Sequence, residues 1–180
     1  MKIISGKYKG KKIASISSNK TRPMMAIARE SIFNSLQIEI KNTRVLDLFS
    51  GSGSLGIEAI SRGAKSCVFV EVSKPAVEVI VYNLSNLQEN QEVIKADVEK
   101  WVINSTSTFS IIFIDPPYKY PSTKLVNIIK NCVDILQDNG KIIIHRNSIS
   151  QRLNGINKLD LVKESKFGQS VITVYRKEEL

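Results

Sequence analysis

A glycine-rich hexapeptide, Gly51 to Gly56, follows directly after a short apolar run from Val45 to Phe49. Its sequence, Gly-Ser-Gly-Ser-Leu-Gly, matches the G-x-G-x-x-G pattern that joins the first strand of a nucleotide-binding sheet to the following helix. Glu71 comes 20 residues after Gly51, at the end of the next apolar run. An acid at this spacing accepts hydrogen bonds from ribose hydroxyls. The pattern therefore predicts a parallel sheet that binds an adenosine-containing ligand.

Apolar runs alternate with helical segments along the rest of the chain, which indicates a sheet covered by helices on both faces. A hairpin is expected near the end, where one strand must run antiparallel. The prediction is an α/β, Rossmann-like fold with a seven-stranded, mostly parallel sheet. Its strands are expected at 45–49, 68–70, 93–94, 111–114, 142–144, 159–164 and 171–175, and its helices at about 54–61, 74–87, around Trp101 and 123–137, with Gly140 ending a turn.

The first 43 residues are expected to form an extension before this core, which would comprise residues 44–180. Two short strands, at 2–5 and 11–14, bracket a turn, and a helix is expected from about Met24 to Ile40. Residues 1–44 contain ten Lys or Arg and only two acids, a net charge of +8, whereas the other 136 residues carry +1. Such a concentrated positive charge is typical of a segment that binds a polyanion.

Four acids are predicted to lie at the carboxyl ends of neighbouring parallel strands, where ligands bind in such sheets. They are Asp47, Glu71, Asp97 and Asp115. A pyrophosphate would be repelled by these carboxylates, whereas the sulfonium and ammonium groups of S-adenosylmethionine would be attracted. One or two of the acids could instead cap helices. The predicted cofactor is S-adenosylmethionine, with a nicotinamide-dependent dehydrogenase as an alternative.

The tetrapeptide Asp115-Pro116-Pro117-Tyr118 follows an aliphatic run and suits methylation of an exocyclic amine on a base. The Asp115 carboxylate and the Pro116 carbonyl can each accept an N–H bond from the amine and stabilise its developing positive charge. Two consecutive prolines hold such a loop rigid. Tyr118 can stack on a base turned out of its helix. The alternative interpretation is that the two prolines only begin a rigid loop and have no catalytic role.

The chain resembles the family of 16S rRNA (guanine(966)-N2)-methyltransferases, over nearly its whole length from Ile3 to about Arg176. The resemblance implies a class I methyltransferase fold and a small-subunit guanine amine as the methyl acceptor. The motifs that carry it are Ile4-Ser5-Gly6, Arg22-Pro23, Arg29-Glu30-Ser31-Ile32-Phe33-Asn34, the segment 45–59, Ser61-Arg62-Gly63-Ala64, Asp115-Pro116-Pro117-Tyr118 and Phe167-Gly168.

The resemblance assigns roles to individual residues. The expected donor contacts are Asp47, Ser50, Gly51, Gly53, Glu71 and Asp97, the expected catalytic residues are Asp115, Pro116, Pro117 and Tyr118, and the expected RNA contacts are Lys7, Lys9, Lys11, Lys12 and Arg22. The chain departs from the family at Met24 and Ala26, where Thr and Asp are usual, and at His145, where an acid usually ends the fifth strand. His145 could touch RNA or simply end a strand.

Other readings stay open from the residues alone. An adenine-N6 methyltransferase acting on DNA or RNA would use the same tetrapeptide, and a non-catalytic RNA-binding module could keep the same fold. Cys67 and Cys132 lie in apolar stretches without metal-ligand spacing, so we expect buried free thiols and no metal. No apolar run is long enough to span a membrane. We expect a cytoplasmic monomer that acts on 16S rRNA within an assembled or assembling small subunit.

Overall fold

The computed structural model describes residues 1–16, 26–88, 90–148, 153 and 156–178. Seven strands form one sheet in the order β3-β2-β1-β4-β5-β7-β6. The pairs from β3 to β5 are parallel, and β7 runs antiparallel to both of its neighbours. The predicted seven-stranded sheet with one antiparallel strand is confirmed. The strands are β1 (Arg44–Leu48), β2 (Ser66–Glu71), β3 (Asn90–Lys95), β4 (Phe109–Ile114), β5 (Leu136–Asn147), β6 (Leu159–Phe167) and β7 (Ser170–Lys177).

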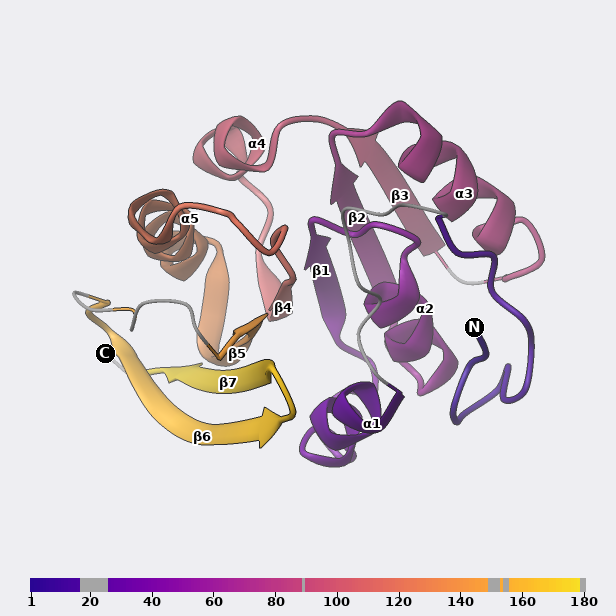
Figure 1. Ribbon diagram of the computed structural model, residues 1–180, viewed down its shortest axis with the longest axis horizontal. Helices are drawn as coiled ribbons and strands as arrows, with labels where there is room; N and C mark the ends of the chain where they lie inside the picture. Colours follow the sequence, from indigo (N-terminus) through magenta and orange to yellow (C-terminus); the bar gives the residue numbers. More distant parts are fainter. Residues whose placement is uncertain (17–25, 89, 149–152, 154–155, 179–180) are drawn as a thin grey trace.

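Helices cover both faces of this sheet (Figure 1). The side chains of α1, α2 and α3 pack into one hydrophobic cluster, and those of α4 and α5 pack into a second cluster on the opposite face. Runs such as Ile111 to Ile114 are buried throughout because successive side chains enter these two clusters in turn. The helices are α1 (Ala26–Asn34), α2 (Ser54–Ser61), α3 (Lys74–Leu84), α4 (Val98–Asn104) and α5 (Ser122–Asp134).

The amino-terminal segment differs from the prediction in two respects. The expected pair of strands is reduced to one isolated antiparallel bridge, between Lys2 and Lys12. The helix expected from Met24 to Ile40 is described from Ala26 and ends at Asn34, after which turns lead to β1. Leu36 and Ile40 are nevertheless buried. The apolar positions at helical spacing include Phe33, Leu36 and Ile40, which are buried, but also Ile27, which is 60% exposed. Turns rather than a continuous helix bring Leu36 and Ile40 to the core.

Three further boundaries were wrong. Helices α3 and α5 end three residues before the predicted positions, at Leu84 and Asp134. Strand β5 starts at Leu136, so Gly140 lies inside the strand and not in a turn before it. The pairing of β4 with β5 is irregular here, since Phe109 lies opposite Leu136 while Ile111 lies opposite Lys141. A strand that carries extra residues against its partner is difficult to recognise from polar letters such as Gln-Asp-Asn-Gly.

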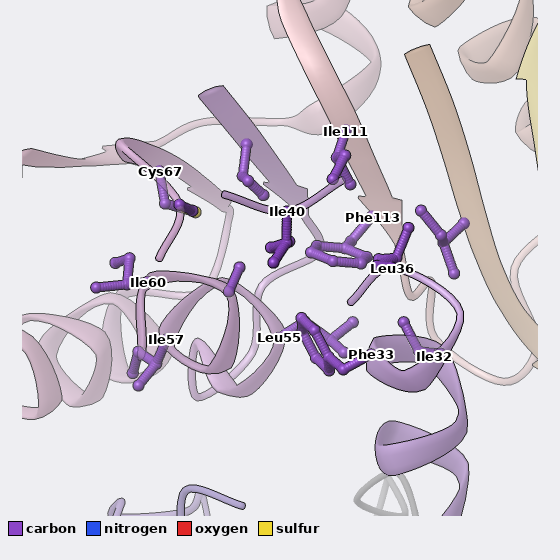
Figure 2. Packing of buried hydrophobic residues seen from close by; sticks show 14 of the residues in the cluster. Ile32, Phe33, Leu36, Ile40, Leu55, Ile57, Ile60, Cys67, Ile111 and Phe113 are labelled. Carbon is purple, nitrogen blue, oxygen red and sulfur yellow. The ribbon is translucent and has the colours of Figure 1, made fainter. Parts of the chain in front are cut away.

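The amino-terminal segment and the sheet share one core. Figure 2 shows Phe33 of α1 beside Phe113 of β4, with Leu36 and Ile40 packed in the same cluster. The centroids of the two aromatic rings are 5.6 Å apart. Ile3 and Ile13 belong to this cluster as well. The amino-terminal segment is therefore packed against the sheet through buried apolar contacts.

The third glycine of the hexapeptide is required by packing. A Cβ atom at Gly56 would lie 2.3 Å from the Phe69 ring and 2.7 Å from Cys67 Sγ. Since interior overpacking costs about 1–3 kcal/mol, Gly56→Ala is expected to lower the free energy of unfolding by that amount in urea denaturation. Gly10→Ala is the control, because nothing lies within 4 Å of its Cβ position and only its φ of 83° opposes the change. Equal stability of Gly56→Ala and the native protein would contradict the packing role.

None of the described helices is long and apolar enough to cross a membrane.

Candidate active site

Strand register gathers the four predicted acids at one edge of the sheet. Glu71 is the last residue of β2, Asp115 follows the end of β4, and Asp97 follows β3 by two residues. Asp47 is the penultimate residue of β1. Because β3, β2, β1 and β4 are consecutive neighbours and parallel, their carboxyl ends meet at this edge. The structure thus brings together the acids and the glycine loop that follows β1.

Two of the acids hold the surrounding loops in place. Glu71 accepts hydrogen bonds from the N–H of Gly51, at 2.9 Å, and from the N–H of Ser73, at 2.9 Å. Asp97 caps α4 by accepting a bond from the N–H of Lys100 at 3.1 Å. A carboxylate has about four acceptor positions. Both side chains therefore keep acceptor capacity for the hydroxyl groups of a bound nucleoside.

Asp47 is almost completely buried, with 1% of its surface exposed. Its Oδ2 accepts a hydrogen bond from the N–H of Gly56 at 2.9 Å, at the start of α2. Burial raises the pKa of the Asp47 carboxyl well above its usual range, and the charges of Asp115 and Glu71 raise it further, while the Gly56 N–H opposes them. A cationic ligand at this edge would stabilise the ionised carboxylates. The electrostatics therefore favour a cation over a pyrophosphate.

The glycine loop adopts a backbone that suits glycine. Gly51 and Gly53 have φ angles of 56° and 78°, in the left-handed region that other residues rarely adopt. Gly53 precedes α2 as its N-cap residue. The Ser50 hydroxyl donates to the carbonyls of Asp47 and Val70, at 2.6 and 3.2 Å, so it ties the loop to β1 and β2. The predicted donor contact of Ser50 would use other atoms than this hydroxyl hydrogen.

The tetrapeptide begins where β4 ends. The Asp115 N–H donates to the carbonyl of Leu48 at 3.4 Å, which keeps the tetrapeptide beside the end of β1. The Pro117 carbonyl accepts from the N–H of Tyr120 at 2.8 Å, so the loop closes into a turn. No described residue donates to the Pro116 carbonyl. Tyr118 is 53% exposed. The loop thus presents a carboxylate, an open carbonyl and an aromatic face together.

Two aromatic residues outside the predicted site, Phe49 and Tyr120, connect the glycine loop to the segment that follows the tetrapeptide. Phe49 has a φ of 58°, unusual for a bulky residue, and directly precedes Ser50. Its ring packs edge-on against Tyr120, with centroids 5.1 Å apart. Residues held in such backbone regions often cluster at functional sites. Phe49 could have been predicted as a site residue from its position in the sequence, between the first strand and the glycine loop.

His145 was also missed as a site residue. Its Nδ1 lies 2.8 Å from Oδ1 of Asp115, so it is not a plain strand end. Ile114, the last residue of β4, lies opposite Ile144 of β5, and Asp115 and His145 are the residues that follow them in the chain. The contact between Asp115 and His145 therefore follows from the parallel register of β4 and β5.

The basic turn, residues 6–12, lies beside the far end of α2. The N–H groups of Ile4 and Ser5 donate to the Glu58 carboxylate, at 2.8 and 3.0 Å, and the N–H of Lys7 donates to the Ser61 carbonyl at 2.7 Å. The side chains of Lys7, Lys9 and Lys12 are exposed, and Lys11 Nζ donates to the Asn86 carbonyl at 3.1 Å. Arg22, together with Pro23 and Met24, lies outside the described residues.

From the basic turn the chain returns toward the glycine loop. Asn83 of α3 donates through Nδ2 to the carbonyls of Ala14 and Ser52, each at 3.0 Å, and accepts from the Ala14 N–H at 2.8 Å. Because α2 has eight residues and each adds about 1.5 Å, the turn and the loop are separated by roughly 12 Å along this helix. One continuous segment therefore links the exposed lysines to the donor side of the site.

Neither cysteine belongs to the site chemistry. Cys67 and Cys132 are free and buried, as predicted. Burial raises the pKa of both thiols, with the Asp47 charge adding to the shift at Cys67. A buried thiol with a raised pKa is a poor nucleophile. Within the described part of the chain, no group of three or more His, Cys, Asp or Glu side chains could hold a metal ion.

Comparison with known proteins agrees with this arrangement. The model of the family described as "Conserved hypothetical protein 95" matches residues 1–176. Ribosomal RNA small subunit methyltransferase D of Buchnera aphidicola (strain Bp) is 38% identical over 92% of this chain and 86% of its own length. The chain belongs to the family that this model describes, together with ribosomal RNA small subunit methyltransferase D. The Escherichia coli K12 protein of the same name is 30% identical over 78% of this chain and 68% of its own length.

The fold comparison leads to the same family. The solved structure of the E. coli protein yhhF, described as a methyltransferase, superimposes with a TM-score of 0.89 at 27% identity, covering 100% of this chain and 99% of that one. The protein is a methyltransferase. The observed site fits S-adenosylmethionine, because buried and half-buried acids suit its cationic groups and Glu71 keeps acceptor capacity for its ribose.

Proposed function

We propose that the protein transfers a methyl group from S-adenosylmethionine to the exocyclic N2 amine of a guanine in 16S rRNA of the small ribosomal subunit. The observation that carries this proposal is the tetrapeptide loop, in which Asp115 and the Pro116 carbonyl stand beside the glycine loop with no described backbone N–H bonded to either acceptor. The methyltransferase D relatives, whose name specifies the small ribosomal subunit, support the choice of RNA.

In this reaction the residues of the chain orient the amine and stabilise its charge. The bound donor supplies an electrophilic methyl group. Asp115 and the Pro116 carbonyl accept the two N–H bonds of the amine, which turns the nitrogen lone pair toward the methyl carbon. As the N–C bond forms and the S–C bond breaks, positive charge develops on nitrogen and these acceptors stabilise it. Tyr118 stacks on the base, and the cationic product amine gives up one N–H proton to water.

The donor contacts of Asp47, Ser50, Gly51, Gly53, Glu71 and Asp97 are part of the proposal. So is the division of labour in which residues 1–43, including Lys7, Lys9, Lys11, Lys12 and Arg22, bind RNA while residues 44–180 carry out methyl transfer. We also propose that the enzyme acts as a monomer in the cytoplasm, on an assembled or assembling small subunit.

The test is to incubate the protein with labelled donor and small subunits that lack the modification. The RNA is then digested to nucleosides and the labelled product is identified. N2-methylguanosine from 16S rRNA is the expected product. N6-methyladenosine would instead establish the adenine alternative, and label in free 16S rRNA but not in subunits would refute the assembled particle as substrate.

A further inference from the structure

The chain contains a single histidine, and it lies against the proposed catalytic carboxylate. His145 Nδ1 and Asp115 Oδ1 are 2.8 Å apart, and the His145 side chain is 14% exposed. The two residues follow Ile144 and Ile114, which are register partners in adjacent strands. Strand pairing therefore sets this contact, whereas long side chains meeting on a surface would be free to separate.

The geometry indicates where the imidazole carries its proton. A carboxylate only accepts hydrogen bonds, so the proton of the shared bond belongs to Nδ1. His145 Nε2 is buried and has no hydrogen-bond partner among the described residues. A proton on Nε2 would be a buried donor without an acceptor, which is costly. The tautomer with its proton on Nδ1 meets both conditions.

Asp115 differs from the other acids at this edge in how it is held. Asp47, Glu71 and Asp97 each accept hydrogen bonds from backbone N–H groups. Within the described ranges, the Asp115 side chain has one hydrogen-bond partner, and that partner is His145. Oδ2 of Asp115 remains available to another donor. The orientation of this carboxylate therefore depends on the imidazole.

We propose that His145 is a positioning residue for methyl transfer, which holds Oδ1 of Asp115 through its Nδ1–H so that Oδ2 can accept from the exocyclic amine. This inference rests on the proposed function, and it gives a role to the single histidine of the chain. The nearest analogy comes from metal sites, where a hydrogen-bond partner orients a metal-binding side chain. Mutation of such a partner lowers activity about 10–100-fold.

The kinetic test compares two substitutions of the same residue. His145→Leu removes the donor and is expected to lower kcat about 10–100-fold with the KM for the methyl donor unchanged. His145→Asn places an amide N–H near the position of Nδ1 and is expected to recover most of the activity. Ile172→Val is the matched control, because Ile172 is the buried cross-strand neighbour of His145 and lacks any hydrogen bond to Asp115. Equal losses in the Leu and Asn variants would overturn the proposal.

Coupling to Asp115 gives a second kinetic reading. If His145 acts only through Asp115, then adding His145→Leu to an Asp115→Ala variant should cause no further loss of kcat, because residues that act as a unit are non-additive. A general loss of packing would reduce kcat again in the double variant. Full additivity of the two losses would therefore refute the positioning role.

A measurement without turnover separates this inference from the proposed function. With ¹⁵N-labelled histidine the protein gives one imidazole spectrum, recorded under mildly alkaline conditions in which imidazole is ordinarily neutral. We expect a protonated Nδ1 and a bare Nε2, and a changed proton distribution in Asp115→Ala. A proton on Nε2 in the native protein, or identical spectra in both proteins, would overturn the proposal. Absence of guanine methylation with the expected spectrum would refute the proposed function and leave the Asp115–His145 contact established.

Discussion

Replacing Asp115 with alanine is expected to lower kcat for methyl transfer about 10²–10³-fold, the loss seen when one charge-stabilising group is removed from a preorganised site. The affinity for the methyl donor should change little, because the glycine loop is held by Glu71 and Ser50 and not by Asp115. The measurements are single-turnover methylation of unmodified small subunits and calorimetric titration with S-adenosylhomocysteine.

Glu71→Ala provides the contrasting control for this prediction. Its carboxylate accepts from the N–H groups of Gly51 and Ser73 and is the predicted ribose acceptor. Its removal should weaken donor binding first and leave kcat at saturating donor largely intact. Near-normal turnover in Asp115→Ala would remove Asp115 from the mechanism. Loss of donor binding in that variant would show that the carboxylate supports the fold of the site and not the reaction.

The second large effect is expected from the basic turn. Replacing Lys7, Lys9, Lys11 and Lys12 with glutamine should weaken RNA binding steeply at low salt, since each lost phosphate contact lowers the slope of log affinity against log salt by about 0.7–0.9. The fold should survive, because the backbone of the turn is bonded to Ser61, the preceding Ser5 N–H is bonded to Glu58, and these lysine side chains lie mostly in solvent. Lys11 is expected to contribute least, since its Nζ donates to Asn86.

A variant of equal charge controls for long-range electrostatics. It replaces four exposed lysines on other elements with glutamine: Lys130, Lys158, Lys163 and Lys166. RNA affinity is measured across a salt series for the native protein and both variants, with donor affinity measured alongside. The control should change the salt slope much less than the basic-turn variant. Parallel slopes for the native protein and the basic-turn variant would show that the turn is a scaffold and that RNA binds elsewhere.

The layered α/β architecture and the glycine loop after the first strand could be predicted from local sequence. Solid apolar runs such as Ile111 to Ile114 need burial on both faces, which only a sheet between helices provides. The left-handed backbone at Gly51 and Gly53 favours glycine, so the glycine pattern in the sequence predicted this loop. The free thiols of Cys67 and Cys132 also followed from apolar neighbours. These features depend on interactions between residues near one another in the chain.

Boundaries were less predictable because several competing signals act at the ends of elements. The apolar spacing of Phe33, Leu36 and Ile40 suits a helix, yet tertiary packing buries Leu36 and Ile40 from turns. Polar residues before Ile142 resemble a loop, yet the pairing with β4 extends β5 back to Leu136. Hydrophobic periodicity reports burial, and more than one backbone conformation can bury the same residues.

The sequence by itself determined which groups are available for the proposed chemistry: a glycine loop, an acid 20 residues later and an Asp-Pro-Pro-Tyr loop at the fourth strand. Only the tertiary structure decided how these groups are held. It places Asp47 in the interior against Gly56, pairs Phe49 with Tyr120, and brings His145 to Asp115 from 30 positions away. The physical reason is strand register. Side chains from different strands meet only after the strands have paired, and no local sequence pattern specifies which residues then lie side by side.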